Sequence, residues 1–230
     1  MSQPLISQSL IHQFCHDIQN PSTVVIGLLD IINDELLGPV SESQKQSLLN
    51  MYFQIRFIST HTRALDWISK LPTLTPSLTT FDLVALIDKQ LSLTKKVTQQ
   101  KDLSFQVTYE HPQHTTKADI TIVSYMIALC LDIALGSAPK QSSITIAVSK
   151  SNNDHAISIS DTGRQLTADE LDCLSQCDSR LISRDFSRLS GLSMYACDQL
   201  AQLFGGQMAL HSNSDQTTTT IHLPDQTMPQ

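Results

Sequence analysis

Apolar residues recur at helical spacing through the first third of the chain. With successive residues about 100° apart, one helix face carries Phe14, Ile18, Val25, Leu29, Ile32 and Leu36. This pattern predicts a helix over Leu5–Leu37, which Gly38 and Pro39 would end. A second apolar repeat, with a period of about 3.5 residues, predicts a helix over Ser43–Lys70. The short connection between the two helices indicates an antiparallel hairpin.

Beyond the hairpin, residues 71–76 contain two prolines and indicate a linker. We therefore expect two domains, residues 1–75 and 76–230. In the second domain the pattern predicts one helix that starts near Thr80 or Asp82 and three more over 119–137, 167–177 and 190–204. It predicts strands near 103–109, 144–148, 157–159, 208–211 and 218–223. Because the strands come in pairs, an α+β layered fold is favoured over a doubly wound sheet.

The two predicted amino-terminal helices display more apolar surface than they can enclose as a pair. Joining two such hairpins in a four-helix bundle would bury this surface, so we expect a homodimer. The alternative is a monomer in which the carboxy-terminal domain covers the hairpin.

The composition limits the kind of binding partner and the cellular compartment that we expect for this protein. The formal net charge of −7 disfavours nucleic-acid and anionic membrane surfaces, which require a basic patch. The most apolar run, 120–131, is shorter than the roughly 20 residues that span a bilayer. The first basic residue is Lys45, so the start of the chain lacks the positive region of a signal peptide. We expect a cytoplasmic protein with a protein partner.

The five cysteines do not predict a metal centre. Their number is odd, and most of them lie in apolar helical patterns, as reduced core thiols do. Cys173 and Cys177 have helical i,i+4 spacing, but no second pair of ligands accompanies them. We expect no metal site in this chain.

One polar stripe on the first helix stands out. The helical wheel places His16 opposite the apolar face and therefore toward solvent. The stripe around it holds small or polar residues, namely Asn20, Thr23, Gly27, Asp30 and Asp34. Such a surface lets another protein approach the helix closely.

The run His16-Asp17-Ile18-Gln19-Asn20-Pro21 resembles the phosphoacceptor box of two-component histidine kinases. Its place on a helical hairpin matches the dimerisation and phosphotransfer element of that family. Three further segments resemble the family's Bergerat-type ATP-binding α/β sandwich: 157–163 with Asp161-Thr162-Gly163, 189–206 with its glycines, and 218–224. The resemblance implies a dimeric four-helix bundle followed by a kinase-like sandwich.

The sequence departs from that family where nucleotide is bound. Leu129 and Ile133 stand at the positions of two asparagines that hold Mg²⁺ and phosphate, or Asp132 and Gly136 do if the register slides by three. Gln165 and Ser190 replace glycines, and residues 164–190 contain no glycine. Glycine matters there because a backbone without side chains can approach phosphates closely. We therefore expect ATP binding to be lost or weak, with Asp161 and Gly163 as a residual site.

A phosphoacceptor hairpin joined to a degenerate ATP domain resembles the ChpT-type histidine phosphotransferases, which share the run Cys15-His16-Asp17. This resemblance implies that a hybrid histidine kinase donates phosphate, that response-regulator receiver domains exchange it, and that the partner supplies Mg²⁺. His16 would be the phosphoacceptor and Asp17 an orienting base. Asn20 would contact water or the partner, and Thr23, Gly27 and Asp30 would contact the partner.

Two other functions remain open from the sequence. A divergent soluble histidine kinase would still use ATP, and Asp161-Thr162-Gly163 favours it. A non-catalytic regulator would bind a kinase or a receiver through the hairpin, and it would not need His16.

Overall fold

The structure, a computed structural model, describes residues 8–151, 154–175 and 191–224. Its contacts divide the chain into two units, Met1–Thr73 and Leu74–Gln230. The first is a helical hairpin and the second an α+β layer, as the patterning of apolar residues predicted for the fold class.

Helix α1 covers Gln8–Asn33 and runs unbroken through Pro21. It ends before the predicted Gly38-Pro39 stop, because Glu35 adopts a left-handed conformation with φ of 57°. The N–H of Leu36 then bonds the Ile31 carbonyl at 3.2 Å, and the N–H of Glu35 bonds that of Ile32 at 3.0 Å. These two bonds form a Schellman motif that closes the helix without a glycine.

Helix α2 covers Glu42–Lys70 and continues into a short 3₁₀ turn, η1, at Leu71–Thr73. Ser41 and Gln44 form a capping box at its start, each side chain bonding the other's backbone N–H. Lys45 pairs with Glu35 across the connection at 2.9 Å. The Lys45 hydrogen bond and charge lower the pKa of the Glu35 carboxyl.

The predicted apolar face of α1 is divided between buried and exposed side chains. Cys15, Ser22 and Leu29 are the buried residues of the helix. Other large apolar side chains of the helix stay exposed, namely Leu10, Phe14, Val24, Val25, Leu28 and Ile31. The helical wheel grouped Phe14 and Val25 with Leu29 because it reports direction within one helix and not which sector a neighbour covers.

The second unit is built on a five-stranded sheet in the order β2-β4-β5-β7-β6. Its strands are β2 (Ser104–Tyr109), β4 (Ser143–Ser151), β5 (Asp154–Asp161), β6 (Gln207–Ser212) and β7 (Thr217–Pro224). β2 and β4 are parallel, and the other neighbours are antiparallel. A separate antiparallel pair joins β1 (Thr79–Asp82) to β3 (Thr115–Ala118).

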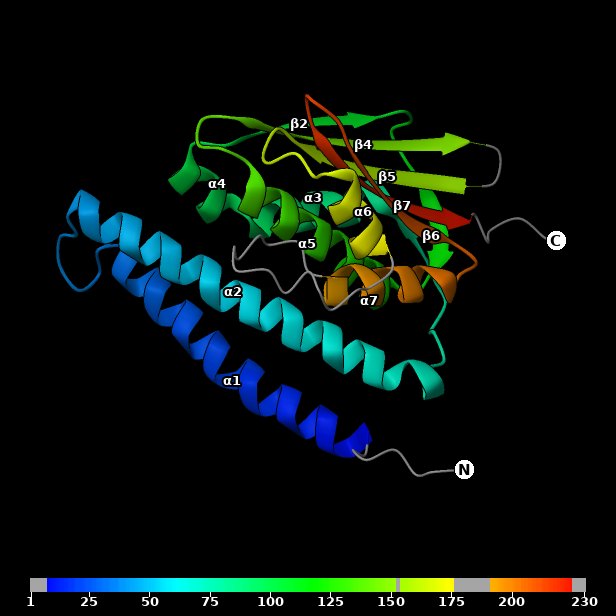
Figure 1. The fold of residues 1–230 in the computed structure, drawn as a ribbon, viewed down its shortest axis with the longest axis horizontal. Helices are drawn as coiled ribbons and strands as arrows, with labels where there is room; N and C mark the ends of the chain where they lie inside the picture. The colour runs from blue at the N-terminus through cyan, green and yellow to red at the C-terminus, as the bar shows by residue number, and fades with distance from the viewer. Residues whose placement is uncertain (1–7, 152–153, 176–190, 225–230) are drawn as a thin grey trace. The chain divides into compact units, whose positions relative to one another are not determined.

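The helices of this unit cover one face of the sheet (Figure 1). They are α3 (Leu83–Leu93), α4 (Lys95–Lys101), α5 (Ile120–Ser137), α6 (Ala168–Ser175) and α7 (Gly191–Gln202). α5 packs against β5, α3 and α7 and is apolar on almost every side. Within the described residues it alone is long and apolar enough to cross a membrane, and 61% of it is buried in the protein.

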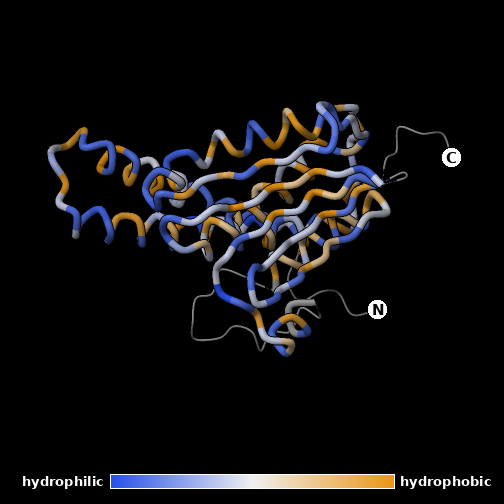
Figure 2. Tube along the Cα trace, turned by 90° about the horizontal axis from the view of Figure 1, so that it is seen from above, coloured by the Kyte–Doolittle hydropathy of each residue, from blue (hydrophilic) through white to orange (hydrophobic). Residues whose placement is uncertain are grey.

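On the opposite face of the sheet, the described residues of this unit form no helical layer (Figure 2), and β5 and β7 pair hydroxyl side chains there. Along β5 and β7, Ser158 bonds Thr220 at 3.0 Å and Ser160 bonds Thr218 at 2.8 Å. The other face of β5 buries Ile157 and Ile159 toward the helices. The alternation of these strands therefore follows directly from one covered and one open face.

Three short elements were missed by the sequence patterns, namely α4, β1 and β3. β1 and β3 are four residues each and mostly polar, so they lack the alternation that marks a strand. The seven-residue α4 has one apolar side chain, Val97, and no helical apolar stripe.

Candidate functional site

His16 lies on α1 with its side chain 58% exposed. One turn later, the Asn20 Nδ2 lies 3.3 Å from both ring nitrogens of His16. The spacing of four residues brings the two side chains together on one helix surface. The imidazole is therefore open to another molecule and has a hydrogen-bonding neighbour.

The Asp17 carboxylate lies beside the His16 imidazole, with 3.7 Å between Oδ1 and Nδ1. That distance is longer than a hydrogen bond. Asp17 Oδ1 instead accepts a hydrogen bond from the Gln13 side chain at 2.8 Å. A role for Asp17 in orienting the imidazole would need a small side-chain rotation toward the ring.

The predicted partner-binding stripe continues along the same helix. Thr23 is exposed, and its hydroxyl donates to the Gln19 carbonyl at 3.0 Å. Gly27 is open, since a Cβ placed there would meet nothing within 4 Å. Asp30 is half-buried. The stripe therefore presents small or polar side chains on the described part of α1.

A second histidine, His12, lies on α1 one turn before His16, and the sequence analysis gave it no role. Its Nδ1 lies 2.7 Å from Oδ1 of Asp66 on α2. The other carboxylate oxygen of Asp66 accepts from Lys70 Nζ, also at 2.7 Å. Because 54 residues separate His12 from Asp66 in the chain, only a prediction of the helix pairing could have brought them together.

The Asp161-Thr162-Gly163 turn follows β5 in the second unit. Asp161 is 3% exposed, and its Oδ1 accepts the Gly163 N–H at 2.9 Å. Burial raises the pKa of its carboxyl, against opposing effects of the Gly163 N–H, the Ser137 side chain and the Lys101 charge. A Cβ on Gly163 would lie 2.4 Å from the Ser137 carbonyl oxygen. The turn thus has a packing reason to keep this glycine, whether or not a nucleotide binds.

Helix α5 carries the positions at which the resemblance predicts the metal-holding asparagines of histidine kinases. Leu129 and Ile133 are 2% and 3% exposed and belong to the core. In the alternative register, Asp132 is half-buried and Gly136 has no side chain. Either register supplies at most one oxygen ligand for Mg²⁺.

The segment after Gly163 is tied to the β6–β7 hairpin. The Leu166 N–H donates to Ser212 at 3.0 Å, and the Gln165 side chain donates to the Ser214 carbonyl. The Thr217 hydroxyl donates to the Arg164 carbonyl at 3.3 Å. Ser190 and most of the predicted glycine-free segment lie outside the described residues, as do Cys177 and the side chain of Cys173. Among the described cysteines, Cys15, Cys130 and Cys197 are buried free thiols.

Lys101, at the end of α4, is buried near the Asp161-Thr162-Gly163 turn, and the sequence patterns gave it no role. Its Nζ donates to the carbonyl oxygens of Leu135 and Ala138 at 2.8 and 2.5 Å. The local sequence offered no signal for this burial, because both partners are more than 30 residues away.

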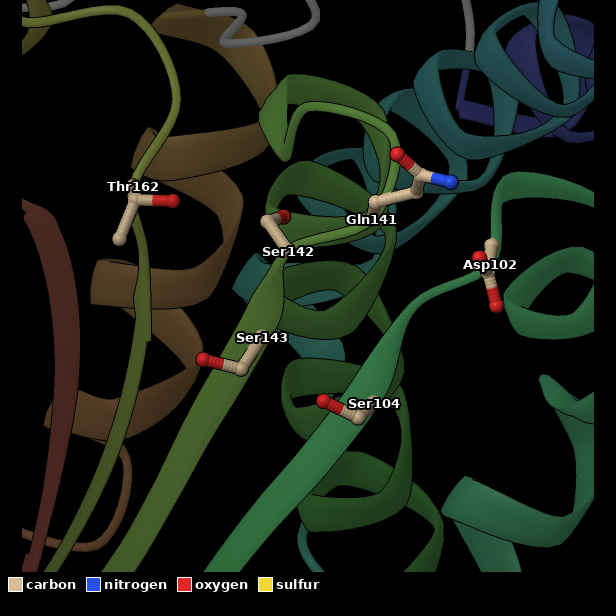
Figure 3. Close-up of a pocket in the computed structure, with 6 residues that line it drawn as sticks. All are labelled: Asp102, Ser104, Gln141, Ser142, Ser143 and Thr162. Atoms are coloured by element: carbon tan, nitrogen blue, oxygen red, sulfur yellow. The ribbon is translucent and has the colours of Figure 1, made fainter.

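An open pocket of about 590 Å³ lies where β2 and β4 begin and β5 ends (Figure 3). It is lined by Asp102, Ser104, Gln141, Ser142, Ser143 and Thr162. This described lining holds one carboxylate and no basic side chain, so it does not favour a phosphate group. Asp161 and Gly163, the predicted residual nucleotide site, do not line this pocket.

Residues 118–227 match the family described as histidine kinase-, DNA gyrase B- and HSP90-like ATPase. The sequence has no match among curated proteins. Among solved structures, the Acinetobacter baumannii histidine kinase AdeS is 18% identical with a TM-score of 0.62, the match covering 92% of this chain and 98% of that one.

Two larger proteins are also similar. Full-length ShkA, solved in complex with AMPPNP, is 13% identical with a TM-score of 0.65, over 95% of this chain and 46% of that one. The histidine kinase ThkA, in complex with the response regulator protein TrrA, is 16% identical with a TM-score of 0.63, over 93% and 60%. At these identities the likeness concerns the fold. The carboxy-terminal unit therefore has the histidine-kinase-like ATPase fold.

Proposed function

We propose that this chain is a histidine phosphotransferase that passes a phosphoryl group between His16 and receiver-domain aspartates. The observation that carries the proposal is the exposed His16 imidazole on a helical hairpin, with Asp17 and Asn20 beside it. A neutral imidazole nitrogen attacks the phosphorus of an aspartyl phosphate, the P–O bond breaks, and the aspartate carboxylate leaves with the electron pair. The receiver would supply the Mg²⁺ ion.

Asp17 and Asn20 would have different roles in this transfer. The Asp17 carboxylate would stabilise the positive charge that the imidazole gains when it is phosphorylated. Asn20, 3.3 Å from the ring, would hold water or a group of the receiver in place. Thr23, Gly27 and Asp30 would form the surface on which the receiver docks.

The proposed homodimer rests on the exposed apolar residues of α1. Leu10, Phe14 and Leu28 are 59%, 55% and 52% exposed, a high exposure for large apolar side chains on one helix. Pairing two hairpins would bury them in a four-helix bundle and leave the His16 stripe outside. Phe14→Asp and Leu28→Asp are expected to give monomers in sedimentation at micromolar concentration, and a wild-type monomer would contradict the dimer.

Several features support a phosphate donor other than ATP. Asp161 is buried and bonded within its own turn, and Leu129 and Ile133 carry no oxygen for a metal. We infer that a hybrid kinase, acting through its receiver domain, supplies the phosphate, and that the relay operates in the cytoplasm.

A divergent ATP-dependent histidine kinase is the second candidate. The match of residues 118–227 to an ATPase family and the retained Asp161-Thr162-Gly163 turn favour it. In that case the ATP domain would bind nucleotide weakly and phosphorylate His16 directly.

The test compares two phosphate sources on the full chain. The protein is incubated with radiolabelled ATP and Mg²⁺, and separately with a phosphorylated receiver domain. We expect label from the receiver alone, and its loss in His16→Gln. His211→Gln, which changes an exposed histidine on β6, is the matched control and should keep full labelling. Labelling from ATP alone identifies the kinase, and labelling from neither source identifies a non-catalytic binding protein.

A further inference from the structure

His12 is held by a carboxylate in a way that His16 is not. An ionised carboxylate can only accept hydrogen bonds, so at 2.7 Å the His12 Nδ1 carries the proton and its N–H donates a hydrogen bond to Asp66 Oδ1. The free lone pair is then on Nε2, the opposite nitrogen of the ring. This carboxylate fixes the tautomer of the imidazole and orients it.

The carboxylate itself is well anchored. Asp66 is 15% exposed, and its second oxygen accepts from Lys70 Nζ at 2.7 Å. The Lys70 ammonium also lies 5.8 Å from the centre of the Trp67 ring. Asp66 thus joins a histidine of α1 to a lysine of α2 and places a positive charge beside the imidazole.

The His12 side chain remains accessible, at 56% exposure. In exposure it resembles His16, at 58%, but the nearest carboxylate to His16 is at 3.7 Å and bonds Gln13 instead. Of the two histidines, His12 is therefore the one whose ring a carboxylate already orients for nucleophilic attack. Four residues separate them, so both lie on neighbouring turns of one exposed surface.

We propose that His12, oriented by Asp66, is a second phosphoryl-accepting histidine on this hairpin. The inference deepens the proposed function, on which its physiological role rests. In the step, Nε2 of His12 attacks phosphorus and forms a P–N bond while the bond from phosphorus to the leaving group breaks. The leaving group takes the electron pair, and the positive charge of the phosphoimidazolium is balanced by Asp66 through the Nδ1–H. Lys70 adds a positive charge that favours the approach of the anionic donor.

The test uses phosphoramidate, a small donor that needs no receiver and releases ammonia on transfer. The full chain is labelled at pH 7, and mass spectrometry under conditions that preserve phosphohistidine maps the sites. We expect phosphate on His12 as well as His16. Asp66→Ala should lower the labelling of His12 by about tenfold or more while leaving His16 unchanged. Asp17→Ala should have no effect on His12.

Asp66→Asn separates orientation from folding. The amide oxygen can still accept the Nδ1–H but carries no charge, so labelling should fall to a level between wild type and Asp66→Ala. Circular dichroism of each variant checks that the helices remain. The inference is overturned if His12 takes no phosphate in wild type, or if Asp66→Ala lowers labelling at His12 and His16 equally.

A receiver experiment separates this inference from the proposed function. If a phosphorylated receiver labels wild type at His16 and phosphoramidate labels His12 with the expected dependence on Asp66, both stand. If the receiver labels wild type only at His16 and phosphoramidate leaves His12 unmodified, the transferase stands and the second acceptor falls. If phosphoramidate labels His12 with the expected dependence on Asp66 but no receiver labels the chain, the second acceptor stands and the proposed function falls.

Discussion

Lys101 at the end of α4 donates a hydrogen bond from its Nζ to the carbonyl oxygen of Leu135 in the last turn of α5, at 2.8 Å. The same ammonium bonds the Ala138 carbonyl at 2.5 Å. The final carbonyls of a helix have no partners within it, and they carry the negative end of its dipole. The buried lysine therefore closes the core helix of the second unit and holds a positive charge near Asp161.

Lys101→Met should destabilise the second unit by about 2 kcal/mol, because buried carbonyl oxygens lose their donor. Urea unfolding followed by circular dichroism measures the change. Lys95→Met, in the exposed first turn of the same helix, is the matched control and should change stability by less than about 0.5 kcal/mol. Equal effects of the two substitutions would contradict a capping role.

Gly163→Ala should be costly, by about 2 kcal/mol or more, because the added Cβ would lie 2.4 Å from the Ser137 oxygen. Gly27→Ala should have the opposite sign. It adds a methyl group in open space on α1 and gains about 0.5–1 kcal/mol of helix stability. Thermal unfolding of both variants tests the pair. If Gly163→Ala is as stable as wild type, the close approach of this turn to Ser137 is contradicted.

Asp161→Asn should stabilise the second unit at pH 7. Because burial raises the pKa of Asp161 in the folded state, its ionised form opposes folding above that pKa, and stability falls as the pH rises through it. The gain from asparagine should shrink as the pH is lowered through this raised pKa, because the folded protein then takes up the proton. Asp161→Ala should cost about 1–3 kcal/mol, because the Gly163 N–H loses its acceptor. Urea midpoints at two pH values distinguish these effects.

His114 should make the second unit sensitive to acid. It is 1% exposed, and burial, followed by the charge of His111, lowers its pKa, while Glu110 and Asp82 oppose this and Lys150 adds to it. The unfolded chain, with a histidine pKa of about 6.5, then takes up the proton first as the pH falls, so stability decreases from pH 7 toward pH 5.

His114→Gln tests this pH dependence. Glutamine can still accept the His111 N–H, which bonds His114 Nε2 at 3.2 Å, but it does not titrate. Its stability should vary less between pH 7 and pH 5 than that of wild type. An unchanged slope would assign the acid sensitivity to other groups.

Local patterns in the sequence were enough for the main elements and for the fold class. Long apolar repeats specify the helices of the hairpin and α5, because burial of one face, or of all faces, dictates the spacing. Alternating strands such as β4 and β5 follow from one covered and one open sheet face. The small and polar residues on the stripe around His16 are a local pattern, and from this pattern His16 was predicted to face solvent.

Tertiary structure decided what local patterns cannot encode. The parallel pairing of β2 with β4 and the division of the α1 apolar residues into a buried and an exposed set both depend on neighbours distant in the chain. The hydrogen bonds from Lys101 to α5 and from His12 to Asp66 depend on such neighbours too, because a hydrogen bond between distant residues exists only once packing fixes their positions. The sequence by itself thus determined that His16 stands on an exposed helix surface, and packing alone decided which histidine has a carboxylate to orient it.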